Sequence, residues 1–187
     1  MLDHSIVHSS DTRGAFMGTQ RRIFLTFAFA VGLLMNQAMA ADLSAGAAVR
    51  IVDGDTLAVE GLPQRIRLYG IDAPEDGQTC FDGQRVVYHC GEAASAALTN
   101  LFGGADVWCQ FKRTGRGTVR HDIYGRILAV CGAGNVDAND WLVRQGFAWS
   151  YRKMKAYRAA EAEARAAGRG VWRGENLQPW EWRKQGN

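Results

Sequence analysis

The sequence predicts an α+β domain, and three observations support this. Short segments with β-branched or alternating apolar residues recur between residues 48 and 130, separated by turns that contain Gly or Pro. One segment with helical spacing lies among them, and two more follow. No internal repeat, low-complexity tract or long linker interrupts this order, so a single domain accounts for it.

The strand-like segments are expected at residues 48–51, 56–60 and 64–71, and then at 106–112 and 126–130. Short turns separate the first three, which indicates a three-stranded meander. In the third segment, Arg67, Tyr69 and Ile71 would share one face, because side chains alternate along a strand.

Helices are expected at residues 91–102, 136–145 and 156–167, and each is followed by a Gly, the residue that commonly ends a helix. One helix before the fourth strand and two after the fifth give the element order of an OB-fold, a five-stranded Greek-key barrel. We therefore predict an α+β fold in the form of a five-stranded OB-fold barrel with three helices.

Residues 1–40 are predicted to be a targeting segment and are left out of the fold. Arg21 and Arg22 precede an apolar run at 23–35, and Ala-Met-Ala follows at 38–40, which is the order of a secretory signal peptide. The run is shorter than the roughly 20 residues of a membrane-spanning helix. We expect cleavage after Ala40 and no stable membrane insertion, with an uncleaved anchor as the alternative. Met17 is an alternative start, since the residues before it do not resemble a signal peptide.

Export would place the mature domain, residues 41–187, in the periplasm or outside the cell.

The 187-residue chain is long enough for a sizeable core. With 47% hydrophobic and 22% charged residues, it is not a disordered, collagen-like or multi-span membrane protein. Its net charge of +3 is too small to indicate a nucleic-acid partner by itself, so the placement of charges has to decide.

An even number of cysteines in an exported chain predicts disulfides. Of the three possible pairings, we favour Cys80 with Cys90 across a short loop, and Cys109 with Cys131 between two strand-like segments. A zinc site is the alternative, but the sequence has no C-x-x-C and no His at finger spacing.

Acidic residues occur at two places that the predicted fold can bring together. The turn 53–55, Asp-Gly-Asp, crowds two carboxylates around a Gly that allows a left-handed backbone, although an ordinary Asx turn also explains it. Asp72 and Glu75 follow the strand that carries Arg67, so these groups can meet at one mouth of the barrel. Oxygen ligands from Asp55 and Asp72 suit Ca²⁺ or Mg²⁺. A salt-bridged surface loop is the alternative.

A second arginine, Arg126, comes at the start of the fifth strand in the motif Asp-Ile-Tyr-Gly-Arg. Two arginines, a carboxylate-bound cation and one further carboxylate are the components needed to cleave a phosphodiester. The arginines and the cation stabilise the charge of the transition state, and the carboxylate activates water.

Four motifs in order, V-D-G-D-T, R-I-R-L-Y-G-I-D-A-P-E, D-I-Y-G-R and L-V-R-Q-G-F-A, resemble the staphylococcal nuclease (thermonuclease) family, and in particular its exported bacterial branch. The resemblance spans about residues 48–172. It implies an OB barrel with three helices and the Ca²⁺-dependent hydrolysis of DNA and RNA, which leaves a 3′-phosphate and a 5′-hydroxyl.

The resemblance also implies roles for single residues. Asp55 and Asp72 would bind Ca²⁺ together with the backbone carbonyl of Ala73, and Asp53 would lie in the outer shell of the metal. Glu75 would act on the attacking water, as general base or by orienting it.

Arg67 and Arg126 would hold the scissile phosphate, because each can donate two N–H groups in a fork. Tyr124 would lie beside the nucleotide, and Tyr151 loosely matches a tyrosine of the nucleotide pocket. Two residues depart from the family pattern. Ala73 stands where the best-known member has Thr, and Ile123 replaces a Lys, so a preference for terminal phosphates is not expected to carry over.

Other basic and aromatic groups admit two interpretations. One loop of the predicted fold is rich in basic residues, namely Lys112, Arg113, Arg116, Arg120 and His121. These residues could contact the phosphate backbone of a nucleic acid, and a solvated surface loop is the alternative. The basic stretch 152–158 is interpreted as a solvated surface, with nucleic-acid contact as its alternative. The tryptophans are expected to anchor the helices and the tail to the barrel; they are Trp141, Trp149, Trp172, Trp180 and Trp182.

The sequence thus predicts an exported, monomeric, Ca²⁺-dependent endonuclease that acts on DNA and RNA. One alternative is a non-catalytic OB-fold module of the cell envelope that binds nucleic acid or protein, which would bind in a salt-sensitive way without turnover. The other is a domain in which Ca²⁺ only stabilises the barrel.

Overall fold

The computed structural model describes residues 42–43 and 48–186, and for Lys153 only the backbone. These residues belong to one compact unit, Gln37–Asn187. The predicted signal segment and its cleavage site lie outside the described residues. Among the helices that are described, none is long and apolar enough to cross a membrane.

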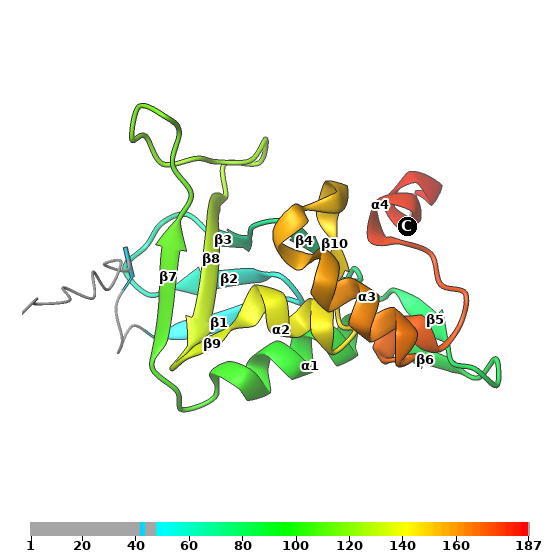
Figure 1. Ribbon diagram of the computed structural model, residues 1–187. Helices are drawn as coiled ribbons and strands as arrows, with labels where there is room; N and C mark the ends of the chain where they lie inside the picture. Colours follow the sequence, from blue (N-terminus) through cyan, green and yellow to red (C-terminus); the bar gives the residue numbers. More distant parts are fainter. Residues whose placement is uncertain (1–41, 44–47, 187) are drawn as a thin grey trace, which may run out of the picture. The chain divides into compact units, whose positions relative to one another are not determined.

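The largest sheet of the described residues is mixed, and five of its six strands follow the order β1-β2-β3-β8-β7 (Figure 1). Its strands are β1 (Val49–Asp53), β2 (Thr56–Val59), β3 (Ile66–Leu68), β8 (Ile127–Ala133) and β7 (Val107–Phe111). The meander β1-β2-β3 is antiparallel as expected, whereas β3 and β8 run parallel. The short strand β9 (Val136–Asp137) pairs with β8, and Leu43 forms an isolated bridge with Cys109 of β7.

The three expected helices are present as α1 (Cys90–Phe102), α2 (Ala138–Arg144) and α3 (Arg158–Ala166), which confirms the α+β class. Helix α2 begins later than expected because 136–137 form a strand, and the Asp137 carboxylate caps the helix by accepting from the Asp140 N–H at 3.0 Å. Helix α3 is likewise preceded by 3₁₀ turns η1 (Tyr151–Lys153) and η2 (Lys155–Tyr157).

The tail contains a fourth helix that the sequence analysis did not predict. Helix α4 (Pro179–Trp182) is one turn long, and a Pro at its first position has a φ angle suited to starting a helix. It lies between the 3₁₀ turns η3 (Gly170–Arg173) and η4 (Arg183–Gln185).

The third predicted strand is in fact two strands. Gly70 has a φ of +82°, which ends β3 before β4 (Ile71–Asp72). The side chains therefore do not alternate through this segment, and the expectation that Arg67, Tyr69 and Ile71 share one face is wrong. Ile71 is buried in the core, and its strand pairs with β10 (Trp149–Ser150).

A hairpin of β5 (Thr79–Phe81) and β6 (Val87–His89) precedes α1 and was not expected either. The disulfide Cys80–Cys90 links this hairpin to the first residue of α1. A second disulfide joins Cys109 and Cys131, which are directly paired across β7 and β8. Both pairs are those expected from the sequence.

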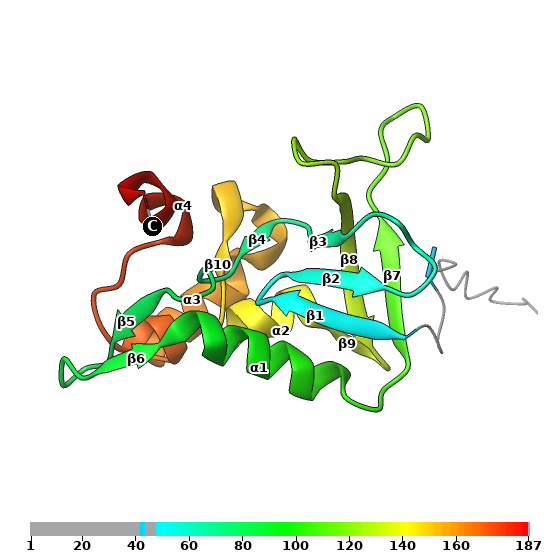
Figure 2. The same ribbon diagram turned by 180° about the vertical axis from the view of Figure 1, so that it is seen from behind.

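The main core lies between the sheet and helices α1 and α2, and α1 runs beside β1 (Figure 2). A smaller cluster forms around the buried Trp149 and includes both half-cystines of the hairpin disulfide. Trp172 packs edge-on against Trp149 at 5.7 Å, and Trp180 contacts the same cluster. These tryptophans therefore fasten the tail to the domain, as expected for residues of their kind.

Candidate functional site

The turn between β1 and β2 holds two carboxylates at one end of these strands. Asp53 accepts a hydrogen bond from the Asp55 N–H at 3.0 Å, and Asp55 itself is 1% exposed. Gly54 does not have the left-handed backbone that we expected. It is required for close packing instead, since a Cβ there would come within 2.7 Å of the Cβ atoms of both Ala73 and Ala94.

The Asp55 carboxylate is surrounded by donors from three elements. Its Oδ1 accepts from Thr56 Oγ1 at 3.1 Å and from Arg67, while its Oδ2 accepts from the Ala73 N–H at 2.8 Å. Burial raises the pKa of Asp55 to about 8, because the loss of solvation outweighs the positive charge of Arg67. Additional positive charge beside Asp55 would stabilise its ionised form and lower its pKa.

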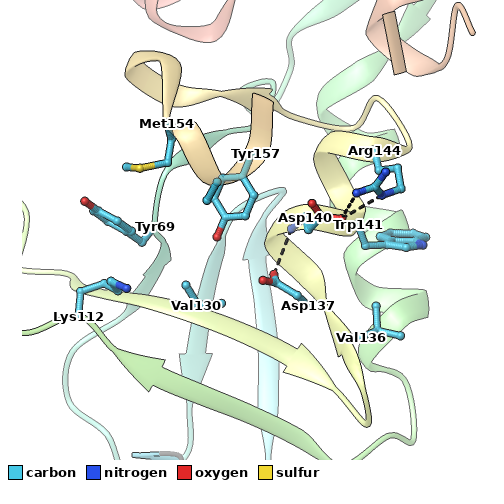
Figure 3. Close-up of a pocket in the computed structure, with 11 residues that line it drawn as sticks. Tyr69, Lys112, Val130, Val136, Asp137, Asp140, Trp141, Arg144, Met154 and Tyr157 are labelled. Atoms are coloured by element: carbon cyan, nitrogen blue, oxygen red, sulfur yellow. Dashed lines mark hydrogen bonds and ion pairs between the residues drawn. The ribbon is translucent and has the colours of Figure 1, made fainter. Parts of the chain in front are cut away.

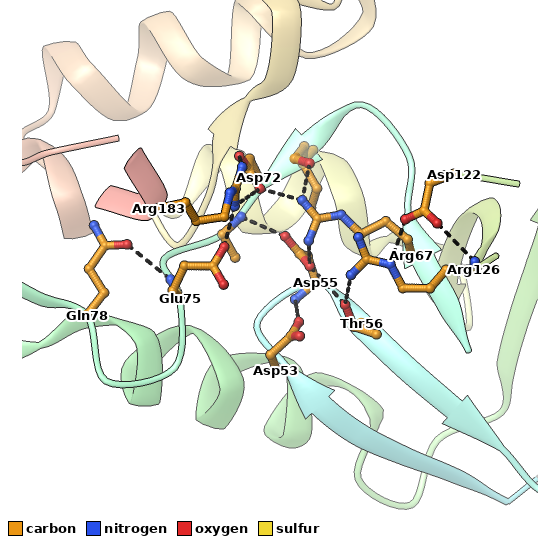
Figure 4. A network of polar contacts seen from close by, with 12 residues as sticks. Asp53, Asp55, Thr56, Arg67, Asp72, Glu75, Gln78, Asp122, Arg126 and Arg183 are labelled. Atoms are coloured by element: carbon orange, nitrogen blue, oxygen red, sulfur yellow. Dashed lines mark hydrogen bonds and ion pairs between the residues drawn. The ribbon is translucent and has the colours of Figure 1, made fainter. Parts of the chain in front are cut away.

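Arg67 of β3 joins the two buried carboxylates of the site. Its guanidinium forms ion pairs with Asp55 and with Asp72, which is fully buried at the end of β4. Figure 4 shows Arg67 lying between these two acids. The split of the third predicted strand is what turns Asp72 back towards Arg67.

A further arginine reaches the same acids from the other end of the chain. Arg183 of η4 donates to Asp72 Oδ2 at 2.8 Å and forms an ion pair with Glu75 (Figure 4). Burial disfavours the charge of Arg183, but its hydrogen bonds to Asp72 and Glu75 outweigh this effect and raise its pKa. Arg183 could not be identified from the sequence, because the tail carries no motif that marks it.

Arg126 approaches the site from the start of β8. Its Nε donates to Asp122 Oδ2 at 2.6 Å, and its Nη1 lies 3.3 Å from Thr56 Oγ1, next to Asp55. Burial opposes the ionised form of Asp122, but hydrogen bonds from Arg126 and from the Tyr124 N–H lower its pKa. We call the assembled group the acid–arginine cluster; it consists of Asp55, Arg67, Asp72, Glu75, Arg126 and Arg183.

The other candidate residues lie outside this cluster. Tyr124 is 76% exposed, with its ring centroid 5.4 Å from the guanidinium of Arg126. Tyr151 packs against Trp180 at 5.9 Å and so belongs to the docking of the tail. Arg113 pairs with Asp42, and Arg116 is exposed, both on the segment that projects from β7 and β8 (Figure 1).

An open pocket of about 660 Å³ lies elsewhere, between Tyr69, Lys112 and helix α2 (Figure 3). No member of the acid–arginine cluster lines it. Its acids are engaged within α2, since Asp137 caps the helix and Asp140 forms an ion pair with Arg144. We therefore do not place the chemistry in this pocket.

The donor set of the cluster fits a hard cation only in part. In the residues that the structure describes, no three His, Cys, Asp or Glu side chains come together as a metal site. A cation between Asp55 and Asp72 would complete its coordination with backbone oxygens and water, which Ca²⁺ accepts readily. The oxygen chemistry therefore suits Ca²⁺, but at present two guanidinium groups balance the charge of these acids.

A mixed six-stranded sheet, with a buried acid–arginine cluster at one end of its central strands, defines a domain suited to phosphate chemistry. Comparison with known proteins agrees: a family described as "Staphylococcal nuclease homologue" matches residues 65–174. Micrococcal nuclease of Shigella flexneri is 34% identical over 177 residues, covering 84% of this chain and 90% of the relative. Succinoglycan biosynthesis protein ExoI of Rhizobium meliloti (strain 1021) is 35% identical over 145 residues, covering 75% of this chain and 71% of the relative.

An uncharacterized endonuclease of Escherichia coli is also similar, with 32% identity over 145 residues, 74% of this chain and 84% of that protein. The chain belongs to the staphylococcal nuclease homologue family, which confirms the resemblance seen in its motifs. The family match includes Arg67, Asp72, Glu75 and Arg126, and it ends before Arg183.

Proposed function

We propose that this protein is an exported, Ca²⁺-dependent endonuclease that hydrolyses DNA and RNA without regard to the sugar. The observation that carries the proposal is the acid–arginine cluster, in which two buried carboxylates, a more exposed carboxylate and several guanidinium groups converge at one end of the strands. The family relationship and the relatives described as nucleases support it.

In this proposal, Asp55, Asp72 and the backbone carbonyl of Ala73 hold Ca²⁺, and Asp53 lies in its outer shell. The Ala73 N–H already donates to Asp55 Oδ2, and Asp72 directly precedes Ala73 in the sequence. Bound Ca²⁺ would supply positive charge to the phosphate as it gains charge in the transition state.

Glu75, which is half-exposed at the rim, accepts a proton from water, and the water oxygen attacks phosphorus. The bond from phosphorus to the 5′ oxygen breaks, and that oxygen takes a proton from solvent. The products are a 3′-phosphate and a 5′-hydroxyl. Arg67 and Arg126 donate N–H groups to the phosphate oxygens, where a guanidinium can make two parallel hydrogen bonds.

Nucleic acid would extend from the cluster along the segment that joins β7 and β8. Tyr124 and Arg126 lie on this segment, and Tyr124 has an exposed aromatic face on which a base can stack. Arg113 and Arg116 would contact the phosphate backbone further along. Tyr151 also remains a proposed contact, although its packing against Trp180 gives it a structural role as well.

The remaining expectations concern the localisation, domain organisation and oligomeric state of the protein. We propose export by the segment 1–40 to the periplasm or beyond, a single mature domain at 41–187 and a monomeric state. Two disulfides agree with a location outside the cytosol. The bridge between Leu43 and Cys109 of β7 supports a closed OB barrel, because Leu43 precedes β1, the strand at the opposite edge of the sheet.

The test uses the purified protein on plasmid DNA and total RNA, with Ca²⁺ or with EGTA. We expect both substrates to be degraded only with Ca²⁺, and Glu75→Gln to lower turnover by about a hundredfold or more while the chain stays folded. Glu60→Gln is the matched control, because Glu60 is an exposed carboxylate at the end of β2.

Retarded mobility of the nucleic acid without cleavage would favour the non-catalytic binding module instead. If Ca²⁺ only stabilises the barrel, it will raise the melting temperature while Glu75→Gln leaves any activity unchanged.

A further inference from the structure

Arg183 makes Asp72 a carboxylate with little capacity left for another ligand. Asp72 Oδ1 accepts from Arg67 and lies 3.3 Å from Arg183 Nη1, and its Oδ2 accepts from Arg183 Nη2 at 2.8 Å. Each carboxylate oxygen offers about two acceptor directions. A cation can therefore approach Asp72 fully only if at least one guanidinium moves away.

Of these two guanidinium groups, that of Arg183 is the easier to displace. The side chain of Arg67 is 14% exposed and is held by both Asp55 and Asp72, whereas that of Arg183 is 40% exposed at the end of the chain. A long, flexible stem at the surface can turn into water without disturbing any packed side chain.

The backbone that carries Arg183 is nevertheless docked firmly. The fully buried Gln78 accepts from the Glu75 N–H at 3.0 Å and donates to the Leu177 carbonyl at 2.8 Å. Asn176 hydrogen-bonds to both the N–H and the carbonyl of Phe81, and Trp180 packs on Tyr151. The tail thus holds Arg183 at a fixed distance from the acids while its side chain remains able to move.

We propose that Arg183 competes with Ca²⁺ for Asp72, so that the C-terminal tail sets the affinity of the site for its cation. This inference rests on the proposed function. Without a cation, the guanidinium neutralises Asp72 and Glu75 and keeps the carboxylates in place. When Ca²⁺ binds, like charges repel at close range, and Arg183 leaves Asp72. The family match ends at residue 174, before Arg183.

The test is calorimetric titration of the purified protein with Ca²⁺, independent of any nuclease activity. We expect Arg183→Met to bind Ca²⁺ about tenfold more tightly than the unmodified chain, because a competing positive charge is removed. Arg183→Lys should fall between the two, since a Lys keeps the charge but not the paired N–H groups.

Lys184→Met is the matched control. It removes the same charge one residue further along, from an exposed side chain, and should leave the Ca²⁺ affinity nearly unchanged. Thermal melting in EGTA establishes that each variant is folded. As a second readout, the Ca²⁺ concentration that gives half-maximal cleavage should be lower for Arg183→Met than for the unmodified chain.

Equal or weaker Ca²⁺ binding by Arg183→Met would overturn the competition, even if the protein is a Ca²⁺-dependent nuclease. An equal gain in affinity for Lys184→Met would overturn it as well, because the effect would then be one of net charge. If no chain binds Ca²⁺ and none cleaves nucleic acid, the proposed function itself fails, and that result is distinct from the first two.

Discussion

The packing of Gly91 against the loop that carries Glu75 gives a quantitative prediction. Gly91 is the second residue of α1, and a Cβ there would overlap the Glu75 carbonyl oxygen and lie 2.8 Å from its carbonyl carbon. Carbon atoms in contact prefer a separation of about 3.5 Å or more. The substitution Gly91→Ala must therefore push the Glu75 backbone away from the helix.

The carbonyl carbon has to retreat by about 0.7 Å to reach that separation, and the overlapped oxygen by more, so the loop moves by roughly 1 Å. A misplacement of about 1 Å at a reacting group can lower the rate by about a hundredfold. Helix propensity acts in the opposite direction, because Ala in place of Gly stabilises a helix by up to about 1 kcal/mol. A loss caused by Gly91→Ala therefore has to come from the displaced loop.

The assay compares kcat, Ca²⁺ affinity and thermal unfolding for Gly91→Ala and the unmodified chain. We expect kcat to fall by about a hundredfold, with a smaller change in Ca²⁺ affinity, because the ion pairs of Arg67 with Asp55 and Asp72 do not involve Glu75. Ala96→Gly is the control, since Ala96 lies on the exposed side of α1. It should cost up to about 1 kcal/mol of stability and leave kcat unchanged.

The reasoning is refuted if Gly91→Ala keeps full kcat while it is folded. It is also refuted if Ala96→Gly lowers kcat as much, because general weakening of α1 would then be the cause.

Two further predictions concern stability. The double substitution of Cys109 and Cys131 by Ala removes a crosslink that spans 22 residues of sequence. Its loss should lower the free energy of unfolding by about 3 kcal/mol and Tm by roughly 10 °C. An unchanged Tm in thermal denaturation would show that this crosslink does not stabilise the protein. Asp122→Asn should destabilise the protein at neutral pH but not in acid. The pKa of Asp122 is lowered from 3.8 in the folded chain, so its contribution is present above pH 4 and is lost as the pH falls further. Melting curves at pH 7 and pH 3 measure this, and an equal loss at both pH values would contradict it.

The sequence allowed much of the site to be predicted, because its acids and arginines lie in short motifs. Asp55, Arg67 and Asp72 were expected to converge, and the structure places them in contact. The reason is local: Asp55 and Asp72 lie at strand ends, Arg67 lies on β3 directly opposite Thr56 of β2, and the turns between the strands are short. The meander of the first three strands was predictable on the same grounds.

Features that depend on tertiary packing could not be predicted in this way. Arg183 reaches Glu75 across 108 residues of sequence, and only the docking of the tail decides that contact. Gln78 looks like an ordinary loop residue, yet it is fully buried between Glu75 and the tail. The role of Gly54 was misjudged for a similar reason, since its neighbours Ala73 and Ala94 are distant in sequence.

The parallel pairing of β3 with β8 has a consequence for the order in which the protein acquires its site during synthesis. Ile66 pairs with Ile127, so the chain between them must be made before Arg126 can approach Asp55. Contacts of such long range form late in folding, after the local hairpins. Arg183 is made later still, because it follows Arg126 in the sequence. A growing chain therefore holds its carboxylates before it holds all of its arginines, and the charges of the site are balanced only after Arg183 has been made.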